Sequence, residues 1–392
     1  MNVPFHQGIQ GEIDAMEAKG TLKSFQHLQA PMSAYTRMEG RGEVLVMSSN
    51  NYLGLASEPE VVEAGKRALD EYGAGTASVR FICGTFTIHR ELEEELARFF
   101  GTERALSYVA CWNANTGLIP TISGPEDVLI CDELNHASLI DGVRLASKTP
   151  RAIYRHADMD HLADLLEEHA TARRKIVVTD GVFSMEGDLA PLDRLVELCE
   201  RHGAISLVDD SHGTGVVGPT GRGTAEHFGV QDRVDIYTST LGKALGGAAG
   251  GFVASSAAVI GLLEQASRPQ IFSNALPPTV SASSLQALRM LARDPGRVQE
   301  LQRKVEVCRA MLRERGYDVN DHPSAIIPIM IGDTAKAIAA SAALLARGVF
   351  VTGFGFPVVP EGTARIRVQV SYAHTEDDFV RFMDALDAVL RG

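Results

Sequence analysis

Short apolar runs alternate with helical segments through the middle of the 392-residue chain, and this alternation constrains the fold more than any other feature. The runs are 105–109, 128–131, 176–179, 205–208, 236–238 and 251–254. Alternation of this kind is typical of βαβ units, in which helices cover a mostly parallel sheet. The sequence therefore predicts an α/β fold, with ligand-binding groups at the carboxyl ends of the strands.

The regions on either side of this alternation have different patterns. A helical stretch at 12–19 and a short strand ending in residues 47–55 precede it. A long helical tract from Pro277 to about Gly316 follows it, and then a strand, a helix, a final strand and a final helix. Because the chain is long for a single core, we expect three parts: an N-terminal segment (1–56), a large domain (57–285) and a smaller α+β C-terminal domain (286–392).

Charge and cysteine usage exclude several classes of protein. The net charge is -13, with 50 acidic and 37 basic residues, and no basic cluster indicates a nucleic-acid partner. No stretch approaches the roughly 20 apolar residues needed to cross a membrane, and no leader pattern is present, so we expect a cytoplasmic protein. The five cysteines are scattered and odd in number, which favours neither disulfides nor a metal site.

One lysine, Lys243, lies among small residues just after the run at 236–238. A phosphate loop of the Walker type would need glycine at position 237 and a hydroxyl residue at 244, where this chain has Tyr237 and Ala244. A lysine in such a turn suits a Schiff base with an aldehyde cofactor, because small neighbours admit a ring. A surface lysine in a glycine-rich loop is the alternative.

Two adjacent carboxylates, Asp209 and Asp210, end the run at 205–208. Either one could hold the proton of a pyridinium nitrogen in a cofactor, since a carboxylate in a low-dielectric place stabilises that cation. Alternatively, a pair of acids at the end of a strand caps a helix or forms an ion pair.

The motifs Asp209-x-x-His212 and Thr240-x-x-Lys243-Ala-Leu-Gly resemble those of the α-oxoamine synthases, a family of fold-type I enzymes that use pyridoxal 5'-phosphate (PLP). The resemblance continues, in order, through segments 48–55, 134–142, 180–188 and 365–369. It therefore covers nearly the whole chain. It implies a large domain with a mostly parallel seven-stranded sheet and a smaller C-terminal domain.

The resemblance also implies roles for residues around the cofactor ring. Lys243 would carry the cofactor as a Schiff base, His136 would stack on the ring, and Asp209 would pair with the pyridine nitrogen. Ser184 and His212 would reach the phenolic oxygen. Without these companions, His136 would be read as an ordinary hydrogen-bonded histidine.

The family's phosphate site maps onto the backbone of Cys111 and Trp112, the hydroxyl of Thr240, and Ser273. In the family that serine comes from the other subunit, so the resemblance implies an obligate homodimer with a shared site. Trp112 departs from the family pattern, because a smaller side chain or a phenyl group is expected there.

The family acts on an amino acid, glycine, whose carboxylate requires a fixed cation. The resemblance places this cation at Arg367, with Asn50 nearby. An arginine binds a carboxylate through two parallel hydrogen bonds, which lysine cannot do. We expect Arg365 to lie on the other face of the strand and to be structural.

Segment 77–85 resembles the branch of the family that transfers an acetyl group to glycine. That branch joins glycine and acetyl-CoA to give 2-amino-3-oxobutyrate and CoA, and it runs in reverse during threonine breakdown. An alternative is the branch that makes 8-amino-7-oxononanoate, or an enzyme with both specificities. From another class, a cofactor-binding regulatory module would have lost Lys243, Asp209 or Arg367, and all three are present.

Overall fold

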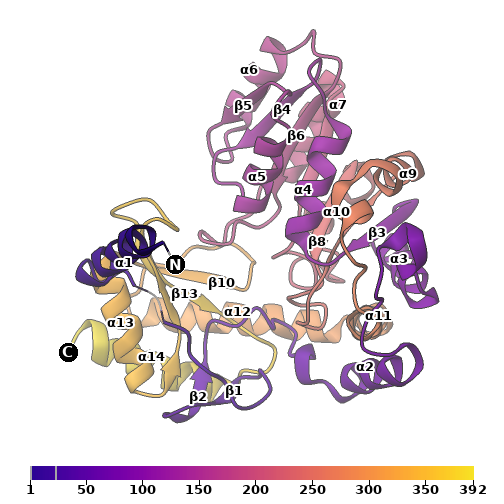
Figure 1. Cartoon of the computed structure of the whole chain (residues 1–392). Coiled ribbons are helices and arrows are strands. Elements are labelled where there is room, and N and C mark those ends of the chain that lie inside the picture. The colour runs from indigo at the N-terminus through magenta and orange to yellow at the C-terminus, as the bar shows by residue number, and fades with distance from the viewer. Residues whose placement is uncertain (1, 23) are drawn as a thin grey trace.

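The computed structural model describes residues 2–22 and 24–392, and a seven-stranded sheet forms its centre (Figure 1). The strand order is β3-β9-β8-β7-β6-β4-β5. The strands are β3 (Arg104–Tyr108), β4 (Val128–Asp132), β5 (Arg151–Tyr154), β6 (Lys175–Asp180), β7 (Ile205–Asp209), β8 (Ile236–Thr240) and β9 (Gly251–Ser255). Among the described strands of this sheet, β9 alone runs in the opposite direction to the others, so its pairings with β3 and β8 are antiparallel. The predicted mostly parallel sheet is thus confirmed.

The central strands are buried on both faces, which explains why the sequence shows them as continuous apolar runs rather than as alternating patterns. Every residue of β4, β6 and β9 is buried. Strand β5 differs, because it lies at the edge of the sheet and exposes Arg151 and Ile153. The apolar runs did not reveal β5 for this reason.

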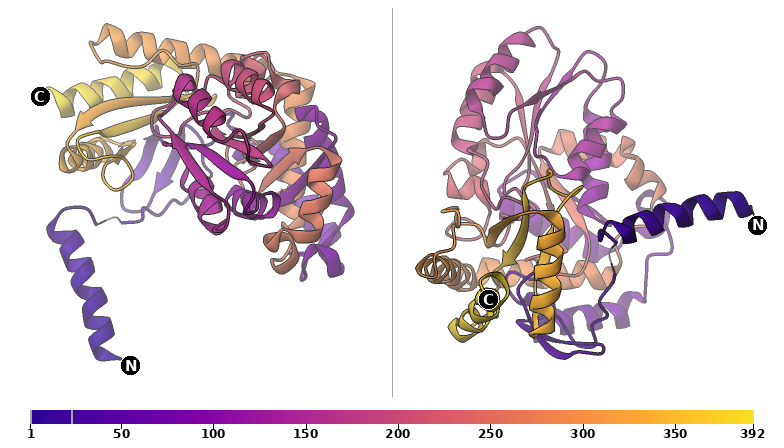
Figure 2. Two further views of the ribbon diagram at one scale, coloured as in Figure 1. Left: turned by 90° about the horizontal axis from the view of Figure 1, so that it is seen from above. Right: turned by 90° about the vertical axis from the view of Figure 1, so that its left-hand side faces the viewer.

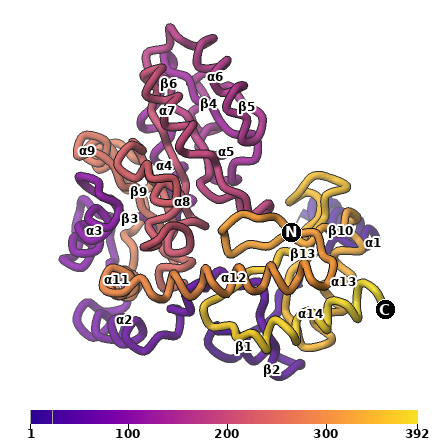
Figure 3. Tube along the Cα trace, turned by 180° about the vertical axis from the view of Figure 1, so that it is seen from behind, coloured from indigo at the N-terminus to yellow at the C-terminus, as the bar shows by residue number. Residues whose placement is uncertain are grey.

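Helices cover both faces of this sheet (Figures 1 and 3). They include α3 (Thr87–Phe100), α4 (Cys111–Ile122), α5 (Ala137–Leu145), α6 (Met159–Glu168), α7 (Leu192–His202) and α9 (Ala257–Ala266), with the shorter α8 (Thr224–His227) and α10 (Arg268–Phe272). Helix α3 buries Leu92, Leu96, Phe99 and Phe100 and ends at Gly101 in the left-handed region, as its apolar spacing predicts.

The C-terminal part has its own sheet. Strand β13 (Ala364–Gln369) lies between β10 (Ile326–Gly332) and β12 (Thr352–Phe354), and both pairings are antiparallel. Helices α13 (Thr334–Ala346) and α14 (Glu376–Leu390) complete this part. The preceding helical tract is two helices, α11 (Pro278–Arg293) and α12 (Gly296–Glu314), because Pro295 between them has no N–H to continue a helix. The limits of the three parts stay predictions.

The N-terminal segment pairs with the C-terminal part. Strand β2 (Gly42–Val46) lies between β1 (Tyr35–Met38) and β11 (Val349–Phe350) and is parallel to β11. Helix α1 (Val3–Ala18) has no buried residue and projects from the body (Figure 2). None of the helices in the described ranges is long and apolar enough to cross a membrane.

Segment 48–57 continues from β2 toward the large domain and ends in a short 3-10 helix at Leu55–Ser57. Helix α2 (Pro59–Tyr72) follows and packs against α11. The segment places Asn50 and Tyr52 against Gln369 at the end of β13, so that the two parts of the molecule meet there.

Candidate active site

Polar groups meet where β4, β6, β7 and β8 end, because the carboxyl ends of parallel strands lie along one edge of a sheet. Asp180 ends β6 and Asp209 ends β7 beside it. His136 follows β4 as the N-cap of α5, and its backbone N–H donates to Asp180 Oδ2 at 2.6 Å. Burial, and then the charge of Asp209, raise the pKa of Asp180 well above its usual value.

Asp209 and Asp210 face different surroundings. Asp209, which is 2% exposed, accepts hydrogen bonds from Asn115 Nδ2 at 2.6 Å and from the backbone N–H of Ser211 at 3.0 Å. Asp210 accepts from the backbone N–H and the hydroxyl of Thr224, both at 2.7 Å, and burial raises its pKa to about 6. Asp210 therefore holds the turn before α8, whereas Asp209 faces the start of α4.

Lys243 lies in the loop between β8 and β9. Its Nζ is 2.8 Å from His212 Nε2, and His212 Nδ1 is 2.8 Å from the hydroxyl of Tyr52. Burial lowers the pKa of Lys243 to about 8, although the charge of Asp209 opposes this shift. Burial and the neighbouring Lys243 also lower the pKa of His212 well below its usual value. The lysine is consequently closer to its neutral form than a surface lysine.

The glycine-rich loop after Lys243 brings β9 against the first turn of α4. A Cβ on Gly251 would lie 2.3 Å from the Cα of Cys111, so only glycine allows this approach. Thr240, at the start of the loop, accepts from the backbone N–H of Gly242 at 3.0 Å and donates to the carbonyl of Gly250 at 3.1 Å. The N-terminus of α4, with Cys111 and Trp112, thus stands next to a hydroxyl, an arrangement that suits an anion.

Arg367 enters from β13. Its Nη1 donates to the carbonyl of Ser184 at 2.8 Å, its Nη2 donates to Gln369 Oε1 at 3.2 Å, and its guanidinium lies over the ring of Phe354. Its Nε is buried and has no hydrogen-bond partner among the described residues. Gln369 Nε2 also donates to Asn50 Oδ1 at 2.6 Å.

The expectation that Arg365 lies on the other face of the strand is wrong. Residues two apart share one face of a strand, and Arg365 extends in the same direction as Arg367. It forms an ion pair with Glu186 at 2.9 Å and donates to the carbonyl of Met185. Both arginines therefore bind one segment of the large domain: Arg365 contacts Met185 and Glu186, and Arg367 contacts Ser184.

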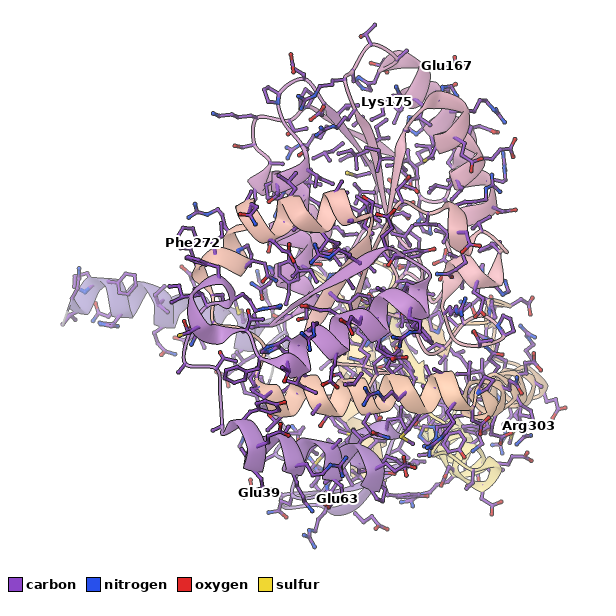
Figure 4. The ribbon with its side chains drawn as sticks, turned by 90° about the vertical axis from the view of Figure 1, so that its right-hand side faces the viewer. Glu39, Glu63, Glu167, Lys175, Phe272 and Arg303 are labelled. Carbon is purple, nitrogen blue, oxygen red and sulfur yellow. The ribbon has the colours of Figure 1, made fainter. Side chains whose placement is uncertain are left out.

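The structure brings together most of the residues that the sequence singled out. His136 and Trp112 lie edge to face with their ring centroids 6.0 Å apart. Ser273 follows α10 and lines a small surface pocket with Arg80 and Asn113, and Lys243 does not line that pocket. The neighbouring Phe272 is 69% exposed (Figure 4).

Three residues of this site were not singled out from the sequence: Tyr52, Asn115 and Gln369. Gln369 shares its strand face with Arg367 through the period of two, and Asn115 lies one helical turn after Cys111. Those two could be found from periodicity. Tyr52 belongs to a segment that carries the family resemblance, but its side-chain partners come from distant parts of the chain.

Comparison with known proteins agrees with this geometry. A family model described as aminotransferase class I and II matches residues 42–386. The chain belongs to this family. Human mitochondrial 2-amino-3-ketobutyrate coenzyme A ligase is 45% identical and covers 98% of this chain and 91% of its own length. The 8-amino-7-oxononanoate synthase of Symbiobacterium thermophilum is 43% identical, with 97% of this chain and 96% of its own length covered.

A solved structure extends the similarity to three dimensions. A variant serine palmitoyltransferase from S. paucimobilis, with a bound PLP–myriocin aldimine, has a TM-score of 0.92 and 30% identity, and the match covers 100% of this chain and 98% of that chain. The resemblance inferred from the motifs and the fold that it implies are confirmed.

Proposed function

We propose that this chain is a PLP-dependent acyltransferase that condenses glycine with acetyl-CoA to give 2-amino-3-oxobutyrate and CoA, in a reversible reaction that serves threonine breakdown. The observation that carries the proposal is the meeting of three groups in one site. A lysine with a lowered pKa, a buried carboxylate and an arginine whose buried Nε has no partner among the described residues converge there. The similarity over nearly the full chain to human 2-amino-3-ketobutyrate coenzyme A ligase supports the choice of substrates.

The chemistry of the donor set fits PLP. Lys243 supplies an amine, Asp209 supplies a carboxylate for a ring nitrogen, and the first turn of α4 supplies N–H donors for a phosphate beside the Thr240 hydroxyl. The close approach at Gly251 keeps these donors together. When bound, PLP withdraws electrons from an attached amino acid and so stabilises negative charge at its α-carbon.

Lys243 would hold the cofactor covalently, and its released amine would remove the proton from the α-carbon of glycine. A pKa near 8 leaves this amine available as a base close to neutral pH. Asp209 would keep the ring nitrogen protonated, and His136 would stack on the ring. Ser184 and His212 would reach the phenolic oxygen.

Arg367 would bind the carboxylate of glycine, with Asn50 beside it. The guanidinium is buried and ion-paired with no described residue, so a carboxylate would supply the missing negative charge. Its Nε, which lacks a partner among these residues, is a free donor for one carboxylate oxygen.

A homodimer in the cytoplasm is part of the proposal. The backbone of Cys111 and Trp112 and the hydroxyl of Thr240 would hold the phosphate from one chain, and Ser273 would reach it from a second copy. Two observations support this arrangement. Ser273 lines a surface pocket that Lys243, His212 and Asp209 do not line, and Phe81, Ile82 and Phe272, in the adjoining segments, expose apolar side chains.

A second candidate is the synthesis of 8-amino-7-oxononanoate, which the 43% identity to the Symbiobacterium enzyme favours. The two functions differ in the acyl donor. Incubation of the purified protein with glycine and a series of acyl-CoAs, followed by mass analysis of the products, separates them. We expect the highest kcat/KM with acetyl-CoA, and a higher value with pimeloyl-CoA would overturn the proposal. Lys243→Ala is the matched blank.

A further inference from the structure

A continuous chain of hydrogen bonds joins Arg367 to Lys243. Arg367 Nη2 donates to Gln369 Oε1 at 3.2 Å, and Gln369 Nε2 donates to the hydroxyl of Tyr52 at 2.8 Å. Tyr52 is 2.8 Å from His212 Nδ1, and His212 Nε2 is 2.8 Å from Lys243 Nζ. The three residues between the arginine and the lysine are at most 7% exposed. Water therefore does not readily replace any of these bonds.

The arginine fixes the orientation of the Gln369 amide. A guanidinium carries only donors, so the group that faces Arg367 must be the amide oxygen. The NH₂ group then points the other way, where it donates to Asn50 Oδ1 at 2.6 Å and to Tyr52. A flipped amide would place donors against donors at Arg367.

The amide in turn fixes the direction of the Tyr52 hydroxyl. Because Gln369 donates to this oxygen, the single proton of the hydroxyl is free to donate to His212 Nδ1. Burial raises the pKa of Tyr52 to about 12, so the hydroxyl keeps that proton. Nδ1 of His212 is then an acceptor, and a neutral imidazole must carry its proton on the other nitrogen.

We propose that Gln369 and Tyr52 are positioning residues that fix His212 as the tautomer with its proton on Nε2, the atom that faces Lys243. The catalytic meaning of this tautomer rests on the function proposed above, but the tautomer itself does not. The sequence offers Tyr52 and Gln369 no catalytic role. The structure assigns them this role through their contacts alone.

The direction of the chain affects the charge of Lys243. An ammonium has three donors and no acceptor, so it cannot accept a hydrogen bond from an Nε2–H group, whereas a neutral amine can. The chain therefore favours the neutral lysine and adds to the effect of burial. The charge of Asp209 opposes it, and that of Arg367 supports it. Burial, and then the charges of Lys243 and Arg367, keep His212 neutral by lowering its pKa.

Gln369→Glu tests the proposal, because a carboxylate has almost the same shape but no proton to donate. Tyr52 would then donate to Glu at position 369, and His212 Nδ1 would have to donate to Tyr52. The measurement is nitrogen-15 NMR of the holoenzyme labelled at histidine, with the His212 signal assigned by its loss in His212→Asn. We expect the proton on Nε2 in the unmodified chain and on Nδ1 in Gln369→Glu.

Gln299→Glu is the matched control. Gln299 is exposed on α12, so the same change in charge at that position should leave the His212 signal unchanged. Tyr52→Phe is a second variant that removes the donor to Nδ1, and we expect both tautomers to be populated in it. A proton on Nδ1 in the unmodified chain, or full retention of the Nε2 proton in either variant, overturns the proposal.

The same samples distinguish this inference from the proposed function. The tautomer is observed in the resting protein, so the result does not depend on which acyl donor the protein accepts. If no acyl-CoA reacts but the expected switch occurs, the function fails and the chain of hydrogen bonds stands. If acetyl-CoA reacts and the tautomer does not switch, the proposed function stands and the proposed role of Gln369 and Tyr52 fails.

Discussion

The two halves of the site bury charges of opposite sign. The half from the large domain contains Asp209, and the half from the C-terminal part contains Arg367. Asp209 is hydrogen-bonded by an amide and by Ser211, while Arg367 is hydrogen-bonded to a carbonyl and an amide. Neither forms an ion pair with any residue in the described ranges. Both differ from Arg365, which is paired with Glu186.

This difference indicates what each half binds. A buried charge with only neutral partners is costly, and a ligand of opposite charge lowers that cost. Asp209 is suited to a protonated ring nitrogen, and Arg367 is suited to a carboxylate. Lys243 lies between them, where the cofactor and the substrate would be joined.

Lys243→Ala should reduce turnover more than any other substitution, because Lys243 would hold the cofactor that both halves of the site bind. We expect turnover of glycine to fall by at least roughly 10²–10⁴-fold, the range for loss of a general base. Borohydride reduction of the unmodified protein should fix the cofactor to Lys243, as peptide mapping will show. An adduct on another lysine, or undiminished turnover in the variant, would remove Lys243 from the centre of the comparison.

Arg367→Ala tests the cationic half. Loss of one member of a buried charge pair costs about 3–5 kcal/mol, so saturation with glycine should require a concentration higher by at least about a hundredfold. The KM for acetyl-CoA should change far less. Arg365→Gln is the control on the same strand face. It should lower the free energy of unfolding and leave the KM for glycine nearly unchanged. Unchanged glycine affinity in Arg367→Ala would remove this residue from the substrate site.

Asp209→Asn tests the anionic half, with Asp210→Asn as its neighbour and control. An amide cannot hold the ring nitrogen in its protonated state, so we expect cofactor binding to persist while turnover falls by about 10²-fold or more, the size of one lost electrostatic contact. Asp210 binds Thr224 instead, so its substitution should act mainly through stability. Equal losses of turnover in the two variants would contradict the distinction between them.

Substitution of His156 should have the smallest effect of the four. Unlike Asp209 and Arg367, His156 is paired with residues of opposite charge. Its ring lies between Asp132 and Asp188, at 3.0 and 2.8 Å. Burial lowers the pKa of His156, but its hydrogen bonds to these two acids outweigh burial and raise it to about 10. A raised folded-state pKa stabilises the fold fully below about pH 6.5 and loses that contribution as pH rises toward 10. Urea unfolding should therefore show that His156→Gln destabilises more at pH 6 than at pH 10.5.

The control for His156→Gln is His6→Gln, because His6 lies on the exposed helix α1. It should change the unfolding free energy little at either pH. If His156→Gln had the same effect at both values, the histidine would not act through its charge.

The sequence predicts those parts of the fold that local pattern determines. Six of the seven strands of the large sheet are apolar runs, because burial on both faces demands apolar residues throughout. Strand β5 is missed, since its place at the edge of the sheet leaves Arg151 and Ile153 exposed. The break at Pro295 is missed because the helical pattern continues across it.

The site divides in the same way. Motifs indicate Lys243, Asp209, His136 and Arg367, and the structure places them together. The contacts of Tyr52 with His212 and Gln369 span 160 and 317 residues, and no local pattern specifies such a pairing. The resemblance selects Asp209 rather than Asp210, and the structure adds the physical difference, because Asp209 accepts from Asn115 whereas Asp210 accepts from Thr224.

Strand β13 holds the segment of Ser184 and Glu186 through both Arg365 and Arg367. The same strand carries Gln369, from which the hydrogen bonds toward His212 begin. A substitution that shifts β13 would alter the attachment of the two parts of the molecule together with the proposed carboxylate site and the proposed proton arrangement at the lysine. Changes in acyl preference during evolution are expected in segments that do not move this strand.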